Sequence, residues 1–261
     1  LDVVNYFKKN CISLTDDQKN TVYEAKVKTI RLPKKSSFSL VGVWTPSTME
    51  KSIDLYGYYE PYMVSKILEH VDEKDLVYDI GADIGYYSVL FSNTVKCEKL
   101  VSVEPNKRRS NFLKTNLENT ESFIYVNKYI GNQADQFSTT IDELVNTTRI
   151  VPTVLKIDIE GAELEALEGA IGLLDNHKPK LFIELHPKMI YEKNKSGINK
   201  IFDIIFSNYK VEFIRNHFGS VKGPAPKNMR WLVTDRKSLL EVCNQIIDYD
   251  EQPRAFGIFC S

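Results

Sequence analysis

The sequence predicts an α/β fold with a seven-stranded, mostly parallel sheet and helices on both of its faces. From about Val77 onward, short apolar runs alternate with helix-like segments, which is the pattern of strands joined by right-handed helical crossovers. Most runs are apolar at successive positions, as expected for strands that are buried on both faces. The first run leads directly into a turn with two glycines, Gly81 and Gly85.

The expected strands follow one another at short intervals. In chain order they are LVYDI, LVSVEP, FIYVNKYI, TVLKIDI, KLFIELH, YKVEFIRN and MRWLVTD. The helix-like segments between them are YYSVLFSN, NKRRSNFLKTNLEN, the stretch from Ile141 to Val145, and AELEALEGAIGLLDN. In the last segment, Leu164, Leu167 and Ile171 recur at spacings of three and four, which places them on one helical face.

The first 70 residues differ in pattern from the rest. FSLVGVWTP is typical of a strand, and DLYGYYEPYMVSKILEHV is typical of an aromatic turn followed by an amphipathic helix. We therefore expect residues 1–70 to form an N-terminal extension that packs over the mouth of the sheet. Residues 71–261 would then form the main domain.

The composition excludes few classes of protein. Of the 261 residues, 43% are hydrophobic and 26% are charged, and the net charge is −1, so no global field attracts nucleic acid or an anionic membrane. No apolar run approaches the roughly 20 residues that span a bilayer. The four cysteines, at 11, 97, 243 and 260, form no CxxC pair, which argues against a zinc ribbon and for reduced thiols in the cytoplasm.

The glycine turn carries acidic residues, with Asp79 before Gly81 and Asp83 between Gly81 and Gly85. One interpretation is a tight strand-to-helix turn in which glycine relieves backbone strain. The other is a nucleotide-type ligand held at the carboxyl end of a parallel strand. Glu104 favours the second, because it ends the next expected strand and is placed to accept hydrogen bonds from two ribose hydroxyls.

Two ligands fit a glycine turn followed by a ribose-binding acid: a dinucleotide and S-adenosylmethionine. The dinucleotide fingerprint is GxGxxG, whereas here three residues separate Gly81 from Gly85. Asp79 and Asp83 would repel a pyrophosphate, but they suit a ligand that carries an ammonium and a sulfonium group. The electrostatics therefore favour S-adenosylmethionine.

Five motifs resemble those of a known family. YDIGADIGYYS, VEPN, STTIDEL, LKIDIEGAELEALEGA and FIELHP are similar, in order and spacing, to the motifs of the FkbM-type methyltransferases, a class I S-adenosylmethionine-dependent group. The resemblance extends from Tyr59 to about Pro187. It implies a Rossmann-like class I fold and O-methylation of hydroxyls on sugars, glycolipids or secondary metabolites. It also makes Glu60 a candidate for binding the methionine ammonium, and it sets Asp83 where the family commonly has Asn.

Polar side chains gather at the ends of two expected neighbouring strands. Lys156, Asp158 and Glu160 alternate along one strand, and Glu184 and His186 alternate along the next. Side chains two residues apart point the same way while a strand lasts, and adjacent strands lie about 4.8 Å apart. We therefore expect these groups to converge at the carboxyl edge of the sheet, where open α/β sheets bind ligands.

Methyl transfer to a hydroxyl needs alignment and a base that takes the proton. His186 is the first candidate for the base, because an unperturbed imidazole titrates near neutral pH. Asp158 or Glu160 would orient His186 or hold the substrate, and Asp158 is also a candidate cofactor ligand.

Simpler interpretations of these residues stay open. Asp158 would cap the following helix, and Glu160, in the first turn of that helix, would be stabilised by the helix dipole. His186 would form a hydrogen bond to the backbone at the end of a strand. A hard-cation site of Asp158, Glu160 and Glu184 is a further alternative, but no dedicated metal spacing supports it, and a metal-free site is expected.

The leading hypothesis is an O-methyltransferase acting on a carbohydrate or small-molecule hydroxyl, with no nucleic acid as partner. The alternatives are a nucleic-acid methyltransferase, a non-catalytic domain that binds the cofactor, and a nicotinamide-dependent dehydrogenase. Specificity for the acceptor is expected in the N-terminal extension and in the loops Lys188–Gly197 and Gly219–Asn228.

Overall fold

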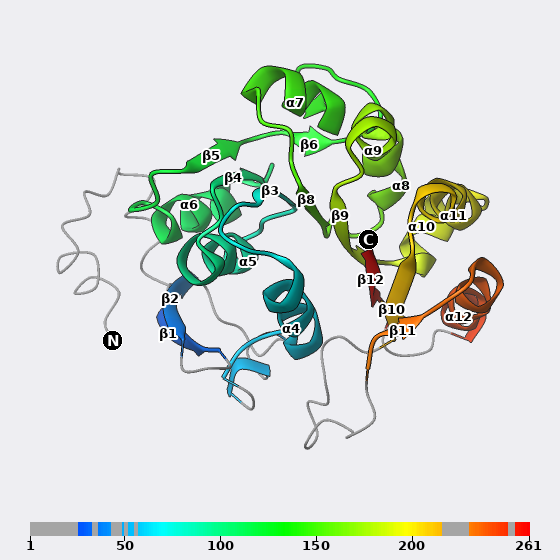
Figure 1. Cartoon of the computed structure of the whole chain (residues 1–261), viewed down its shortest axis with the longest axis horizontal. Coiled ribbons are helices and arrows are strands. Elements are labelled where there is room, and N and C mark those ends of the chain that lie inside the picture. Colours follow the sequence, from blue (N-terminus) through cyan, green and yellow to red (C-terminus); the bar gives the residue numbers. More distant parts are fainter. Residues whose placement is uncertain are drawn as a thin grey trace.

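The computed structural model describes residues 26–32, 36–42, 49, 52–54, 57–215, 230–249 and 254–261. Within these residues, eight strands form the main sheet in the order β11-β10-β12-β9-β8-β3-β4-β5 (Figure 1). Their bounds are β3 Leu76–Ile80, β4 Lys99–Val103, β5 Phe123–Val126, β8 Val154–Ile157, β9 Lys180–Leu185, β10 Val211–Ile214, β11 Leu232–Val233 and β12 Phe256–Cys260. The predicted α/β fold with a mostly parallel sheet is confirmed.

The parallel part of the sheet runs from β9 through β8, β3 and β4 to β5. Strand β12 is antiparallel to both of its neighbours, β9 and β10. The carboxyl ends of the five parallel strands therefore lie along one edge of the sheet, and the C-terminal strand lies inside the sheet rather than at its border (Figure 1).

The sequence analysis expected seven strands in the main sheet, whereas the described residues form eight. The run MRWLVTD contributes only the two-residue edge strand β11, whereas β12, which the sequence analysis missed, lies between β9 and β10. The run FIYVNKYI divides into β5 and a short strand, β6 (Tyr129–Ile130). Strand β6 pairs with β7 (Ser138–Thr139) in a separate two-stranded sheet.

Helices cover both faces of the main sheet (Figure 1). One face carries α7 (Ile141–Thr148), α8 (Glu163–Glu168), α9 (Ile171–His177), α10 (Pro187–Lys193), α11 (Gly197–Asn208) and α12 (Arg236–Tyr249). The other carries α4 (Pro61–His70), α5 (Tyr86–Val89), the π-helical turn η2 (Leu90–Val95) and α6 (Lys107–Asn116). Alternate residues of β3 enter the two cores, with Val77 in one and Tyr78 and Ile80 in the other.

The segment AELEALEGAIGLLDN forms two helices, α8 and α9, instead of one. The break lies at Gly169, where an added Cβ would meet the carbonyl oxygen of Gly131 at 2.2 Å. The Gly169 carbonyl accepts a hydrogen bond from the Asp142 backbone N–H. The close approach of a neighbouring loop therefore interrupts a segment whose apolar spacing favours a continuous helix.

The N-terminal region forms a hairpin and a helix. Strands β1 (Lys26–Arg31) and β2 (Ser37–Gly42) pair antiparallel, and the Asn116 side chain on α6 bonds both the N–H and the carbonyl of Val41. Helix α4 packs its buried face, with Met63, Val64 and Ile67, against the same core as α5. A division of the chain at residue 70 remains a prediction. No helix in the described ranges is long and apolar enough to cross a membrane.

Candidate active site

A cavity of about 440 Å³ lies at the carboxyl ends of the parallel strands. Six of the nine residues predicted for the site line it: Gly81, Asp83, Glu104, Asp158, Glu160 and His186. Glu60, Asp79 and Gly85 are not among the lining residues. The cavity also has aromatic walls, which include Tyr59, Tyr86 and Tyr87.

Glu104, which follows β4, is held by two loops. Its Oε1 accepts a hydrogen bond from the Asn106 N–H at 2.8 Å, and its Oε2 accepts one from the Asp83 N–H at 3.0 Å. The side chain is only 5% exposed, and burial raises the pKa of its carboxyl group, while the two N–H donors oppose that rise. Glu104 therefore joins the glycine turn to the loop after β4 and fixes a carboxylate at the cavity wall.

The two glycines of the turn are required by the chain itself. Gly81 has φ +81°, and an added Cβ would lie 1.8 Å from the carbonyl oxygen of Asp158, which the neighbouring strand presents. Gly85 has φ +94° and begins α5, where an added Cβ would meet Leu113 on α6 at 2.9 Å. Both positions thus fit the tight-turn interpretation, and Gly81 in addition faces the cavity.

Asp83 is paired with an arginine that the sequence analysis left without a role. Arg109 Nε lies 3.2 Å from Asp83 Oδ1, and both residues line the cavity. Burial raises the pKa of the Asp83 carboxyl group, and the Arg109 charge lowers it. The guanidinium therefore compensates the charge that Asp83 brings to the glycine turn.

Asp79 and Glu60 lie behind the cavity wall. Asp79 is fully buried, and its Oδ2 accepts a hydrogen bond from Ser88 Oγ at 2.6 Å. Among the described residues, its Oδ1 has no hydrogen-bond partner. Glu60 is 1% exposed and accepts a hydrogen bond from the Tyr87 hydroxyl. Burial raises the pKa of the Asp79 carboxyl group, and neither Asp79 nor Glu60 is a lining group.

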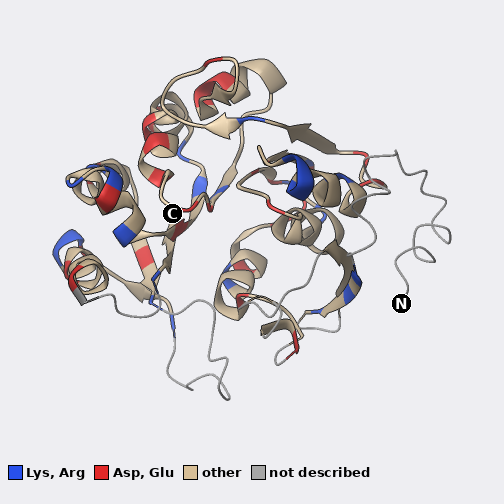
Figure 2. Ribbon diagram, turned by 180° about the vertical axis from the view of Figure 1, so that it is seen from behind, with Lys and Arg blue, Asp and Glu red and all other residues tan. Residues whose placement is uncertain are grey.

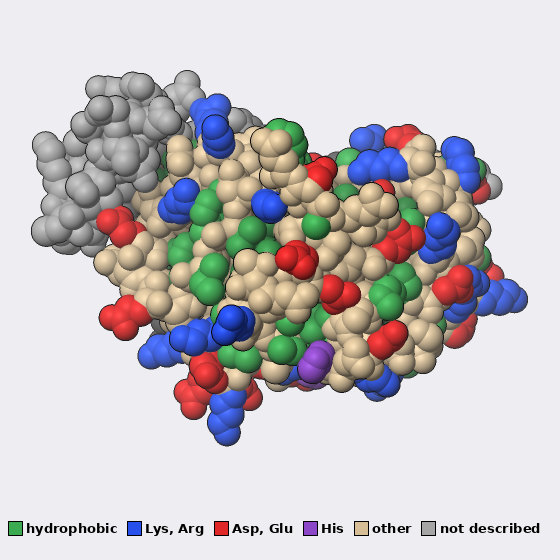
Figure 3. Space-filling view, turned by 90° about the horizontal axis from the view of Figure 1, so that it is seen from above, with side chains coloured by type: hydrophobic (Ala, Val, Ile, Leu, Met, Phe, Trp, Pro, Cys, Tyr) green, Lys and Arg blue, Asp and Glu red, His purple; other side chains and the backbone are tan. Residues whose placement is uncertain are grey.

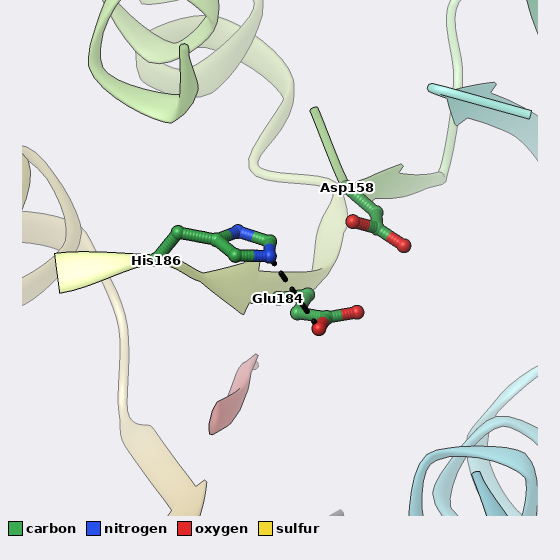
Figure 4. A group of neighbouring side chains, drawn as sticks. All are labelled: Asp158, Glu184 and His186. Atoms are coloured by element: carbon green, nitrogen blue, oxygen red, sulfur yellow. Dashed lines mark ion pairs between the residues drawn. The ribbon is translucent and has the colours of Figure 1, made fainter. Parts of the chain in front are cut away.

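Asp158, Glu184 and His186 lie together at the ends of β8 and β9 (Figure 4). One ligand atom from each lies within 4.8 Å of the others. His186 Nε2 is 3.6 Å from Glu184 Oε1, and its Nδ1 is 2.7 Å from Glu163 Oε1. The structure thus brings together the groups of the two strand ends, with Glu163 on α8 as an additional partner.

The charge state of His186 differs from the expectation of an ordinary imidazole. Burial alone would lower its pKa, but the hydrogen bond and charge of Glu163, followed by Glu184 and Asp158, raise it to about 9. Burial and the Asp158 charge also raise the pKa of Glu184 well above its usual range. In the unliganded protein, His186 is therefore protonated at neutral pH.

Glu160 lies beyond the end of strand β8. Strand β8 ends at Ile157, Glu160 has a positive φ of 49°, and its side chain is exposed. The alternation of side chains stops where the strand stops, so Glu160 is not part of the group of Asp158, Glu184 and His186.

Lys156 was expected among the converging groups but was given no role, and Glu163 was not singled out by the sequence predictions. Lys156 is 2% exposed, and its Nζ lies 3.4 Å from Asp158 Oδ2 and 4.3 Å from the centre of the Tyr87 ring. Burial would lower the pKa of Lys156, but nearby carboxylates raise it, Asp158 most strongly. Glu163 is fully buried. No local sequence pattern pointed to Glu163, because its carboxylate reaches His186 only through the packing of α8.

Comparisons with known proteins are consistent with this geometry. Residues 133–219 match the model of the family described as the methyltransferase FkbM domain. No curated protein matches the chain.

Three similar solved structures share little sequence with this chain. A methyltransferase FkbM from Methylobacillus flagellatus KT is 22% identical over 61% of this chain and 46% of its own, with a TM-score of 0.48. TYW2 from M. jannaschii, in complex with AdoMet, is 13% identical over 91% and 85%, with a TM-score of 0.46. A precorrin-6y C5,15-methyltransferase from Geobacter metallireducens GS-15 is 14% identical over 76% and 85%, with a TM-score of 0.44. The present chain thus spans less than half of the Methylobacillus protein.

Proposed function

We propose that this chain is an S-adenosylmethionine-dependent methyltransferase of the FkbM type, which the family match over residues 133–219 supports, and that it methylates a hydroxyl group of a sugar, a glycan or another small metabolite. The observation that carries the proposal is the meeting of Asp158, Glu184 and His186 after β8 and β9, in a cavity that Glu104, which follows β4, also lines. Strand β3 lies between β8 and β4 in the sheet, so Glu104 would serve a nucleoside while the three other groups act on a hydroxyl.

The residues of the cavity fit S-adenosylmethionine, which supplies a methyl group on a positively charged sulfur when it is bound. Glu104 would accept hydrogen bonds from the two ribose hydroxyls, because the N–H groups of Asn106 and Asp83 already fix its orientation. Asp79 and Glu60 would place negative charge behind the wall near the methionine end. The excess of carboxylates favours a cation here over a pyrophosphate.

Asp158, Glu184 and His186 would act on the acceptor. The hydroxyl proton has to leave as the oxygen forms its new bond to carbon. His186 is the predicted proton acceptor, and with a pKa of about 9 it performs that role only after it has lost its own proton. Glu163 would hold the ring so that Nε2 faces the two carboxylates.

The surface supports a small acceptor more than a nucleic acid. The net charge is −1. Basic and acidic side chains both occur across the ribbon (Figure 2), and they are interspersed on the face seen from above (Figure 3). Binding to nucleic acid draws mainly on clustered Lys and Arg that neutralise phosphates.

The test is to incubate the protein with methyl-labelled S-adenosylmethionine and, in separate samples, with fractions of sugars, glycans and small hydroxyl compounds and with RNA, DNA and protein. Label in an ether linkage on an acceptor oxygen is the expected result, and the Asp158→Asn variant should reduce its formation. Label that appears only in RNA, DNA or protein would contradict the proposed acceptor class.

A further inference from the structure

We infer that Asp158, Glu184 and His186 bind one divalent cation beside the hydroxyl group that is to be methylated. The cation site itself follows from the geometry of the three side chains. Its placement next to the acceptor rests on the proposed function. The sequence analysis weighed a different cluster, with Glu160 in the place that the structure gives to His186.

The three donors are spaced as ligands of a single ion. One atom from each lies within 4.8 Å of the others, and the side chains share one space at the ends of β8 and β9 (Figure 4). The 3.6 Å between His186 Nε2 and Glu184 Oε1 is too long for a hydrogen bond. Donors bound at 2.0–2.2 Å to one ion lie about 3–3.5 Å apart, so a small contraction would complete the site.

Glu163 provides an independent observation from outside the three residues. This carboxylate on α8 is fully buried, and its Oε1 lies 2.7 Å from Nδ1 of His186. The Gly161 N–H donates to the same oxygen at 3.1 Å. A histidine that binds a metal almost always gives its other ring nitrogen to a carboxylate or carbonyl, which fixes the ring and its tautomer. Here that arrangement leaves Nε2 as the nitrogen that faces Asp158 and Glu184.

Charge also favours a cation. The carboxyl groups of Asp158 and Glu184 lie beside His186 on one side and that of Glu163 on the other, and Glu184 and Glu163 are buried. Buried carboxylates are stable only when they are paired or coordinate a metal. Lys156 is the internal rival for this role, because its Nζ lies 3.4 Å from Asp158 Oδ2.

Two carboxylates and one imidazole suit Mn²⁺, Mg²⁺ or Zn²⁺, and three protein ligands leave coordination positions open. Asp158 and His186 line the cavity, so an open position would face the acceptor. A bound cation lowers the pKa of an oxygen that it coordinates, which would assist removal of the hydroxyl proton.

The experiment is titration of Mn²⁺ into the full chain after treatment with a chelator, with free Mn²⁺ measured by electron paramagnetic resonance. We expect one Mn²⁺ per chain. Glu184→Gln and His186→Gln should each weaken binding at least about tenfold, and Glu163→Gln should weaken it about 10–100-fold through loss of the ring support. Glu160→Gln is the matched control, since it removes an exposed carboxylate of the same cavity, and it should leave the Mn²⁺ affinity unchanged.

S-adenosylhomocysteine is titrated into the same samples, and thermal unfolding reports whether each variant is folded. Absence of Mn²⁺ binding, or binding that Glu184→Gln and Glu163→Gln do not weaken, would overturn the inference and leave Lys156 as the resident cation. If S-adenosylhomocysteine still binds in that case, the proposed function stands. Mn²⁺ binding without S-adenosylhomocysteine binding would contradict the proposed function alone.

Discussion

Glu104 links the cofactor wall to the backbone around it, and its replacement should affect binding before folding. Glu104→Ala removes a carboxylate whose bonds to ribose hydroxyls are charge-assisted and contribute about 1.5–3 kcal/mol each. We expect affinity for S-adenosylhomocysteine to fall at least about tenfold, as measured by calorimetry. Glu118→Ala, which changes an exposed acid after α6, is the control. An unchanged dissociation constant for Glu104→Ala would show that this residue does not hold the ribose.

From the raised pKa of His186 we predict how the free energy of unfolding of chelator-treated protein depends on pH. The folded-state pKa is about 9 and the ordinary value is 6.5, so His186 stabilises the fold fully below pH 6.5. That contribution, about 3 kcal/mol, is lost as the pH rises through 9. The difference in unfolding free energy between wild type and His186→Gln should therefore shrink between pH 6 and pH 10. A difference that stays constant over this range would contradict the raised pKa.

At the scale of residues, sequence reasoning succeeds where strand geometry decides and fails where partners come from distant segments. Glu104, Asp158 and His186 line the cavity because each follows a parallel strand, and their roles in binding and catalysis stay predictions. Glu160 was expected on the same face as Asp158, but the strand ends before it. Glu163 meets His186 only through the packing of α8 against the end of β9, which no local pattern encodes.

At the scale of structural elements, the glycine turn after β3 can be tested by comparing an alanine substitution in the turn with one at a glycine elsewhere. Gly81→Ala would put a Cβ 1.8 Å from the Asp158 carbonyl in a backbone region with φ +81°. Strain at such a φ costs about 1–3 kcal/mol, and the overlap with backbone adds to it. We expect a large loss of unfolding free energy in denaturant titration. Gly131→Ala, where the nearest atom is 3.8 Å away, should have little effect, and equal losses would contradict this account of the turn.

Element boundaries show why local patterns do not suffice. The helical spacing across residues 162–176 favours one helix, yet contact with the loop at Gly131 divides it at Gly169. The side chain of Asp142 then accepts hydrogen bonds from the N–H groups of Gly172 and Leu173, at the start of α9. Tertiary contacts of this kind override local propensity.

At the scale of the whole molecule, the position of β12 inside the sheet is the feature that the sequence least revealed. Five buried residues at the end of the chain form a strand between β9 and β10. The order of the strands along the chain does not determine between which neighbours a strand lies in the sheet. The alternation of strands and helices did predict the class of fold, because it reflects the layering of the entire domain.

This position of β12 predicts an asymmetry between two substitutions. Ile258 in β12 is fully buried, whereas Leu232 in β11 is 43% exposed at the sheet edge. Ile258→Ala should lower the unfolding free energy by about 2–5 kcal/mol. Leu232→Ala should change it by about 0.5 kcal/mol or less. Urea unfolding measures both, and similar values for the two variants would contradict the strand order.

The central claim is that the cavity at the carboxyl ends of the parallel strands binds S-adenosylmethionine and not a dinucleotide. Calorimetric titration of the wild-type chain with S-adenosylmethionine, S-adenosylhomocysteine and NAD tests it most directly. The account predicts one molecule of S-adenosylmethionine or S-adenosylhomocysteine per chain, with weaker binding by Glu104→Ala, and no heat of binding for NAD. Binding of NAD without binding of S-adenosylmethionine would contradict it.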